Sequence, residues 1–218
     1  MIDVKICGIR DRAALDAAIA GGARHVGLMF FPRSPRFVEP ADAAALTSAA
    51  DGRIERVGVF VNPNDDHLWR ILDIVTLDVL QLHGRETPDR VADVRRRFGL
   101  PVWKAASIAD AGDVERARAY EDIADAVLFD AKPPKDHTNA LPGGNAIAFD
   151  WRLVRDLEWR GRWILSGGLT PENVGAALRL TGAPAVDVSS GVENVPGEKD
   201  PALIRAFLAA CEQSATAG

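Results

Sequence analysis

Short apolar stretches alternate with helix-forming stretches eight times along the chain, and no other feature limits the possible folds as strongly. The apolar stretches are typical of β-strands and begin near Ile2, His25, Ile54, Leu77, Pro101, Asp125, Arg162 and Ala185. We expect helices over residues 12–20, 40–50, 64–75, 88–98, 112–120, 149–157, 171–180 and 201–211. Strands that alternate with helices in this way form parallel sheets. Eight such units predict an α/β protein with a single closed (β/α)8 barrel, the TIM barrel, and an open doubly wound sheet is the alternative.

Several of the expected helices have a clear start signal. Asp11 precedes the first helix as a candidate N-cap. Thr87, Thr170 and Asp200 each stand directly before a proline, which is the order expected of an N-cap and the first helical residue. We therefore expect three of the helices to begin at these prolines.

Composition and charge exclude several classes of protein. No Pro-, Gly- or Ser-rich linker divides the 218 residues, so one catalytic domain over residues 1–218 is expected. A net charge of -5 gives no electrostatic reason to expect nucleic acid or an anionic membrane as a partner. The two cysteines form no CxxC or Cys/His cluster, which argues against a disulfide framework or a zinc site. With no signal peptide or membrane span in view, we expect a cytoplasmic enzyme that acts on a small solute.

Cys7 ends the first expected strand, where Gly8 begins a turn. In that strand Val4 and Ile6 share one face, while Lys5 and Cys7 share the other. Taken alone, a free cysteine is usually a small buried hydrophobe. The strand ends of a TIM barrel carry its active site, so a catalytic role for Cys7 is the competing interpretation.

Two strand-to-helix connections are longer than the others, residues 30–39 and 131–148. In a barrel both would rise from the face at the carboxyl ends of the strands. We therefore interpret them as candidate lids over an active site, with surface elaboration as the alternative.

Polar residues follow other strands at the same face. Asn62, His83, Lys104 and Asp130 are the clearest. Cys7 and Asp130 are the pair best suited to moving protons, with a thiolate as base and a carboxylic acid as donor. Asp130 could instead cap a helix or pair with Lys132, and His83 could be a hydrogen-bonding spectator.

Small Gly- and Ser-rich loops follow the last two strands. The loop after the seventh strand contains Gly167 and Gly168, and the loop after the eighth contains Ser189, Ser190 and Gly191. A phosphate needs close backbone approach and several N–H donors, which glycine permits. This pair of loops is the usual phosphate site of a TIM barrel, so we predict phosphate binding here.

The chain also resembles the phosphoribosylanthranilate isomerase family over nearly its whole length. The resemblance rests on residues 5–8, 31–36, 57–62, 81–84 and 187–193, together with 149–151 and 167–174. It implies an Amadori rearrangement of N-(5-phosphoribosyl)anthranilate to 1-(2-carboxyphenylamino)-1-deoxyribulose 5-phosphate in tryptophan biosynthesis. It also implies that no cofactor or metal is needed, because an imine formed within the substrate acts as the electron sink.

The same resemblance implies roles for individual residues. Cys7 would be the general base that takes the proton from C2, and Asp130 the general acid that protonates the ring oxygen. Arg36 would bind the anthranilate carboxylate with a forked pair of donors. Apart from the resemblance, we also predict that His83 and Asp187 contact the substrate. The sixth connection departs from the family, which usually has Gly-Gly-Thr-Gly where this chain has residues 143–146 as Gly-Gly-Asn-Ala. This departure puts the behaviour of that lid in question, and the sequence leaves monomer and homodimer both open.

Two other functions compete with this interpretation. One is another phosphate-binding barrel, such as indole-glycerol-phosphate synthase or the related isomerase of histidine biosynthesis. The other is a non-catalytic phosphosugar-binding protein. Cys7 in the first strand argues against both enzymes, and Cys7, Asp130 and Arg36 together argue against the binding protein.

The protonation states required for catalysis are rare at ordinary pKa values. Only about 3% of a Cys thiol is ionised and about 0.1% of an Asp protonated at pH 7. We therefore expect the site to shift both groups, with the Lys5 ammonium favouring the Cys7 thiolate. Because a buried ammonium needs a partner and the eighth strand closes against the first, Asp187 is the expected partner of Lys5.

Overall fold

Eight parallel strands close into a barrel in which each strand pairs with the next and β8 pairs with β1. The computed structural model describes residues 2–132, 148–155 and 157–216. The strands are β1 (Asp3–Cys7), β2 (His25–Met29), β3 (Glu55–Phe60), β4 (Val79–Leu82), β5 (Val102–Ile108), β6 (Ala126–Ala131), β7 (Trp163–Leu165) and β8 (Ala185–Val188). Each expected strand start lies within two residues of the observed one. The TIM barrel predicted from the sequence is confirmed, and the open sheet is excluded.

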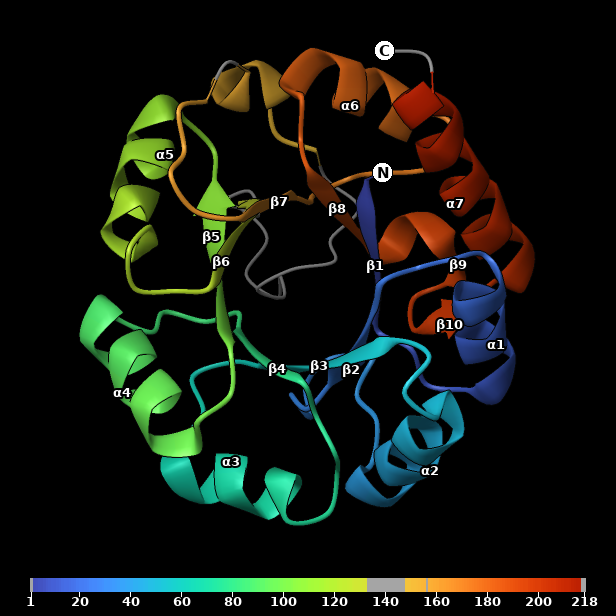
Figure 1. Ribbon diagram of the computed structural model, residues 1–218, viewed down its shortest axis with the longest axis vertical. Coiled ribbons are helices and arrows are strands. Elements are labelled where there is room, and N and C mark those ends of the chain that lie inside the picture. Colours follow the sequence, from blue (N-terminus) through green and yellow to red (C-terminus); the bar gives the residue numbers. More distant parts are fainter. Residues whose placement is uncertain (1, 133–147, 156, 217–218) are drawn as a thin grey trace.

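Helices surround the barrel on its outside (Figure 1). They are α1 (Arg12–Ala20), α2 (Pro40–Ala50), α3 (Asp65–Leu72), α4 (Pro88–Phe98), α5 (Ala111–Ala117), α6 (Val174–Thr181) and α7 (Pro201–Thr216), with 3-10 turns η1 (Arg118–Tyr120), η2 (Trp151–Val154) and η3 (Ser190–Val192). The predicted N-caps hold at two helices, where Asp11 accepts from Ala14 N–H and Thr87 accepts from Arg90 N–H. The helix after Asp200 also begins at its proline.

Two helix predictions are wrong. The segment predicted as a helix over 149–157 forms only η2, because Arg155 already has an extended backbone, with φ −69° and ψ 137°. Helix α6 begins at Val174 and not at Pro171. Asn173 accepts from Thr170 N–H and donates to the Gly168 carbonyl, so its side chain holds this segment against the loop after β7 and the helix starts only beyond it.

Strand alternation divides the core into two layers. Val4 and Ile6 of β1 belong to the large layer between barrel and helices. Cys7 belongs to the smaller layer inside the barrel, with residues such as Val57 and Leu128. The predicted two faces of β1 are therefore confirmed, and the inward face carries the polar residues.

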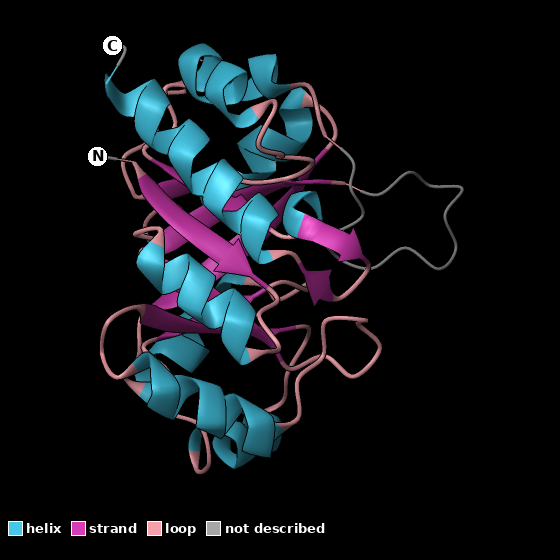
Figure 2. Ribbon diagram, turned by 90° about the vertical axis from the view of Figure 1, so that its right-hand side faces the viewer, coloured by secondary structure: helices cyan, strands magenta, loops and turns pink. Residues whose placement is uncertain are grey.

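A short hairpin that the sequence did not predict follows β8. It consists of β9 (Glu193–Val195) and β10 (Glu198–Lys199), paired antiparallel. Figure 2 shows it at the end of the barrel toward which the strands point. Most of the second candidate lid, residues 131–148, lies outside the described residues, including the departure at 143–146. Among the described residues, no helix has the length and apolar character needed to cross a membrane.

Candidate active site

Lys5 and Asp187 form a buried ion pair inside the barrel. They face each other in the register of β1 and β8, and Lys5 Nζ donates to Asp187 Oδ1 over 2.7 Å. Ser166 Oγ donates to the second carboxylate oxygen, Oδ2, over 3.2 Å. Burial lowers the pKa of Lys5, but Asp187 and Cys7 outweigh it, so the pKa is raised overall. The predicted partner of Lys5 is confirmed, and Lys5 is a fixed positive charge in the site.

Cys7 is the last residue of β1, and its thiol is buried beside Lys5. Close approach at this point requires Gly27 on β2, because a Cβ there would lie 2.8 Å from Cys7 Sγ and 3.1 Å from Lys5 Nζ. Burial raises the pKa of the thiol, and the nearby ammonium of Lys5 only partly opposes this. The expectation of a thiol shifted toward the thiolate is therefore wrong for this structure. Desolvation of the charged form is the larger effect.

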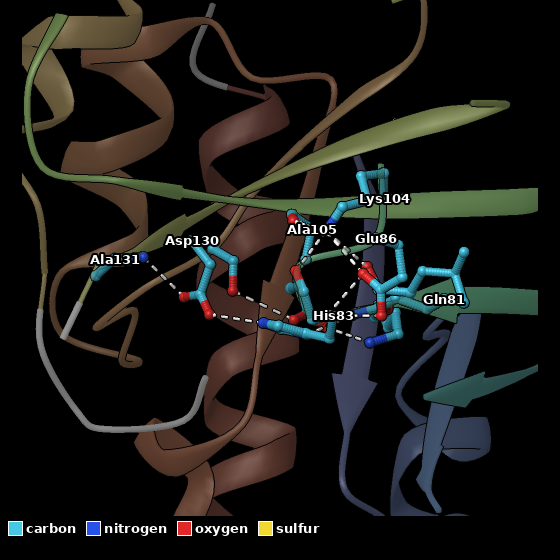
Figure 3. A network of polar contacts seen from close by, with 12 residues as sticks. Gln81, His83, Glu86, Lys104, Ala105, Asp130 and Ala131 are labelled. Carbon is cyan, nitrogen blue, oxygen red and sulfur yellow. Dashed lines mark hydrogen bonds and ion pairs between the residues drawn. The ribbon is translucent and has the colours of Figure 1, made fainter. Parts of the chain in front are cut away.

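Asp130 lies in β6 and is buried at the carboxyl end of the barrel. Its Oδ1 accepts from the backbone N–H of Ala131 over 2.9 Å, and its Oδ2 lies 3.1 Å from His83 Nε2 (Figure 3). Lys132 pairs with Asp113 instead, over 3.3 Å. Of the three alternatives that the sequence left open, the structure excludes pairing with Lys132, and Asp130 caps none of the described helices.

His83 follows β4 and connects Asp130 to Gln81. Gln81 Nε2 lies 3.0 Å from His83 Nδ1, so both ring nitrogens have partners. Lys104 and Asn62, which the sequence also placed at the mouth, hold the turn after β4. Lys104 Nζ lies 3.1 Å from Glu86 Oε2 and donates to nearby carbonyl groups. Asn62 Oδ1 accepts from the backbone N–H of Arg85 over 2.7 Å.

Beside this network lies a cavity of about 670 Å³. Its lining includes His83, Lys104 and Lys132. The His83 side of the site therefore has room for a small molecule, with basic groups around it.

Arg36, in the first long connection, is buried and already holds a carboxylate. Its Nε and Nη2 both donate over 2.8 Å to the two oxygens of Glu193, which is the forked geometry expected for the substrate. Lys199 also contacts Glu193 and donates to Ser189. Burial raises the pKa of Glu193, but Arg36 and Lys199 outweigh it and lower the pKa overall. A substrate carboxylate would have to displace Glu193 or approach the guanidinium from its other edge.

The two predicted phosphate loops pack directly against each other. Gly167 and Gly168 have left-handed backbone, with φ of 83° and 67°. At Gly191 a Cβ would lie 1.9 Å from the carbonyl oxygen of Leu169, so only glycine permits this contact. Ser189 Oγ donates to the carbonyl of Cys7 over 3.1 Å, which links the second loop to the candidate base.

Sequence reasoning did not identify Gln81, Glu193 or Lys199 as parts of the site. Gln81 and Glu193 lay within the family motifs, but nothing in their local pattern named their partners. Lys199 belongs to the unpredicted hairpin and gave no signal. Arg36 and Glu193 are 157 positions apart in the sequence. Such a pair can be recognised only once the barrel is closed.

Comparison with known sequences gives matches over nearly the whole chain. The family profile of N-(5'-phosphoribosyl)anthranilate isomerase matches residues 4–210. A protein of that name from Paramagnetospirillum magneticum is 54% identical over 209 residues, covering 96% of each chain. Its counterpart from Paracoccus denitrificans is 55% identical over 208 residues, covering 95% of this chain and 96% of the other.

Solved structures show the same similarity. The phosphoribosyl anthranilate isomerase of Thermotoga maritima superposes with a TM-score of 0.86 at 36% identity, covering 98% of this chain and all of the other. Another isomerase structure, a complex with reduced 1-(o-carboxyphenylamino)-1-deoxyribulose 5-phosphate, has a TM-score of 0.83 at 35% identity and covers 98% and 100% of the two chains.

Proposed function

The chain belongs to the N-(5'-phosphoribosyl)anthranilate isomerase family, and we propose that it carries out this isomerisation with Cys7 as general base and Asp130 as general acid. It is an enzyme of tryptophan biosynthesis that converts N-(5-phosphoribosyl)anthranilate to 1-(2-carboxyphenylamino)-1-deoxyribulose 5-phosphate by an Amadori rearrangement. The assignment of the two residues is supported by one observation in particular. A buried thiol beside an ammonium and a buried carboxyl group lie at the carboxyl ends of two non-adjacent strands, β1 and β6.

The two groups divide the proton transfers of the reaction. Asp130 gives a proton to the furanose oxygen, the ring opens, and the anthranilate nitrogen becomes part of an iminium ion. The Cys7 thiolate then removes the proton from C2, and the electron pair moves toward the nitrogen. The enolamine that results becomes the ketone product. Lys5 supports this step because its fixed ammonium opposes the burial that disfavours the thiolate.

Other residues hold the substrate in this proposal. The backbone N–H groups around Gly167, Gly168, Ser190 and Gly191 bind the phosphate, and Ser189 positions their loop. Arg36 binds the anthranilate carboxylate, and His83 contacts the substrate beside Asp130. Asp187 was predicted to contact the substrate, but both of its oxygens already accept from Lys5 and Ser166, so we assign it to positioning Lys5.

The experiment that tests the two assignments follows the loss of substrate fluorescence in Cys7→Ser and Asp130→Asn. Each variant should lose at least about 10²-fold in kcat, the contribution typical of a general acid or base. Cys211→Ser is a matched control, because Cys211 is also a buried free cysteine but lies in α7. Near wild-type activity in either variant, with an unchanged circular dichroism spectrum, removes that residue from the mechanism.

Two further measurements on the wild-type protein, of substrate binding and of turnover of another aminoaldose, test the competing functions. A wild-type protein that binds phosphoribosylanthranilate without turnover would be a phosphosugar-binding protein. Turnover only of the histidine-pathway aminoaldose would indicate the related isomerase. We further propose that the enzyme acts in the cytoplasm on a free phosphosugar, as a monomer or homodimer. It needs no metal or cofactor, because the substrate's own iminium nitrogen is the electron sink; activity should survive dialysis against a chelator.

A further inference from the structure

Gln81 is a fully buried amide in β4 that no step of the reaction uses. It lies two residues beyond Val79, which belongs to the layer inside the barrel, so the two side chains point to the same face. Its Nε2 lies 3.0 Å from His83 Nδ1 (Figure 3). Its Oε1 is buried without a hydrogen-bond partner among the residues that the structure describes. A buried amide that makes so few hydrogen bonds lowers the free energy of unfolding. Its contact with His83 therefore points to a functional role.

The contact with Gln81 is coupled to the contact with Asp130 through the imidazole ring. A neutral imidazole has one N–H and one lone pair. If Gln81 Nε2 donates to Nδ1, the ring proton is on Nε2 and is donated to Asp130 Oδ2, 3.1 Å away. If the amide were reversed, Nδ1 would carry the proton. The lone pair of Nε2 would then face Asp130 Oδ2, and a proton between them would be required.

The tautomer of His83 decides where the acidic proton of Asp130 lies. With the Nε2–H form, His83 donates to Oδ2 and Ala131 N–H donates to Oδ1, so neither neighbour accepts a proton from the carboxyl group. The proton of the acid form then points away from both and toward the substrate. With the Nδ1–H form, His83 would accept that proton, and it would be lost to the ring opening.

We infer that Gln81 is a positioning residue: its amide holds His83 as the Nε2–H tautomer and so keeps His83 from taking the acidic proton of Asp130. This inference rests on the proposed role of Asp130 as the general acid. It also accounts for an amide at position 81, since a carboxylate would accept from Nδ1–H and fix the opposite tautomer.

The charged groups nearest to Gln81, His83 and Asp130 have partners of their own. Lys104 of β5 contacts Glu86 and the carbonyl of Gly84, and Lys132 after β6 contacts Asp113 of α5. On the far side of the barrel, Lys5 contacts Asp187. Gln81 is therefore the group that faces Nδ1, and it does not titrate.

The direct test is the tautomer of His83, measured by ¹⁵N NMR on protein labelled at its 4 histidines, with His83→Asn to assign the signal. Wild type should show a protonated Nε2 and an unprotonated Nδ1. Gln81→Glu should convert His83 to a form with a protonated Nδ1. An Nδ1–H tautomer in the wild type overturns the inference, and this measurement needs no variant at position 81 to fold.

Kinetics provide the second readout. Gln81→Met, which has similar volume and no donor, should lower kcat roughly tenfold with KM little changed, the loss expected for a buried hydrogen bond. Gln81→Glu should lose about 10²-fold near neutral pH and recover relative to wild type as the pH falls, because a protonated Glu can donate to Nδ1 again. Leu80→Met, a volume-conserving change on the outer face of the same strand, is the control and should leave kcat unchanged.

The outcomes separate this inference from the proposed function. If Asp130→Asn keeps wild-type activity, Asp130 is not the acid, and the NMR result still reports the Gln81 contact by itself. If Asp130→Asn is inactive while both Gln81 variants keep the wild-type kcat and pH profile, the positioning role of Gln81 is wrong and the acid assignment stands.

Discussion

As the proposed general base, Cys7 must lose its thiol proton before it can act, and burial raises the pKa of this thiol above its ordinary value. The wild-type profile also depends on Asp130, which must carry its proton while Cys7 is ionised, and these two requirements oppose each other as the pH changes. In Asp130→Asn the acid no longer titrates, so the residual kcat/KM should rise with pH until Cys7 is ionised and should still increase between pH 7 and pH 9. A profile that is flat over this range would mean that substrate binding lowers the thiol pKa before the proton transfer or that another group is the base. Comparison of kcat with kcat/KM across the range separates the two.

Lys5 is expected to affect the pH at which this rise in kcat/KM occurs, which is the acidic limb of the profile. Lys5→Met removes the ammonium that lowers the pKa of Cys7, so the limb should shift to higher pH. The variant also leaves Asp187 without its ion-pair partner, at a cost of about 3–5 kcal/mol in folding free energy. Urea unfolding must therefore accompany the pH profile. An unshifted limb in a folded variant would show that Lys5 does not act on Cys7.

Arg36→Lys should weaken substrate binding while leaving chemistry largely intact. A lysine has one ammonium and cannot make the forked contact that Arg36 makes with a carboxylate. We expect KM to rise by about tenfold or more with kcat little changed, as measured in the fluorescence assay. Arg33→Lys in the same connection is the control, since Arg33 is exposed. Unchanged kcat and KM in Arg36→Ala would remove Arg36 from the binding site.

Among the elements, the loops after β7 and β8 form the proposed phosphate site, and we expect them to bind phosphate only while they stay packed against each other. Gly191→Ala should separate them, because its Cβ would lie 1.9 Å from the Leu169 carbonyl oxygen. The affinity for inorganic phosphate, measured by calorimetry, should fall by about tenfold or more, as expected when the backbone donors move apart. Gly22→Ala, where a Cβ would meet no atom within 4 Å, controls for a general loss of stability. Equal phosphate affinity in both variants would place the phosphate elsewhere.

Strand β2 contributes a pH dependence to stability. His25, its first residue, has a pKa lowered from 6.5 to about 3, chiefly by burial, and its ring contacts Trp103 edge-on. The unfolded chain takes up this proton below pH 6.5 and the folded chain does not. Stability is thus fully present above pH 6.5 and is lost toward pH 3, by up to about 1.4 kcal/mol per pH unit. Urea unfolding at pH 7 and pH 5 should show the loss, and His25→Gln should reduce it; an identical slope in both proteins would assign it to other groups.

At the scale of the whole molecule, closure of β8 onto β1 joins the two ends of the chain in one barrel. We therefore expect residues 1–218 to unfold as a single cooperative unit. The 5 tryptophans include Trp69 in α3, Trp103 in β5 and Trp163 in β7, so their fluorescence reports on several parts of the barrel. Fluorescence and circular dichroism should give coincident transitions in urea. Two separate transitions would show that the chain contains two folding units.

The barrel could be predicted from the sequence, because each strand and each helix shows in the spacing of apolar residues within its own segment, and the alternation occurs eight times. It also gave the inward face of β1 and the pair of Lys5 with Asp187, since closure of this fold sets β8 beside β1. Three helix starts, at Arg12, Pro88 and Pro201, followed from the residues that precede them. These features need only near neighbours or the general geometry of the fold.

The pairing of the polar groups in the site could not be predicted from the sequence and is seen only in the folded barrel. Glu193 on Arg36, and Gln81 on His83 beside Asp130, depend on side chains that meet across the closed barrel. The direction of the Cys7 pKa shift also needed the structure, because it is a balance between burial and a neighbouring ammonium. A sequence shows that both groups are present. The packed barrel sets the distance between Cys7 and Lys5 and excludes water around them. The distance and the exclusion of water together decide whether burial or the ammonium has the larger effect on the pKa of Cys7.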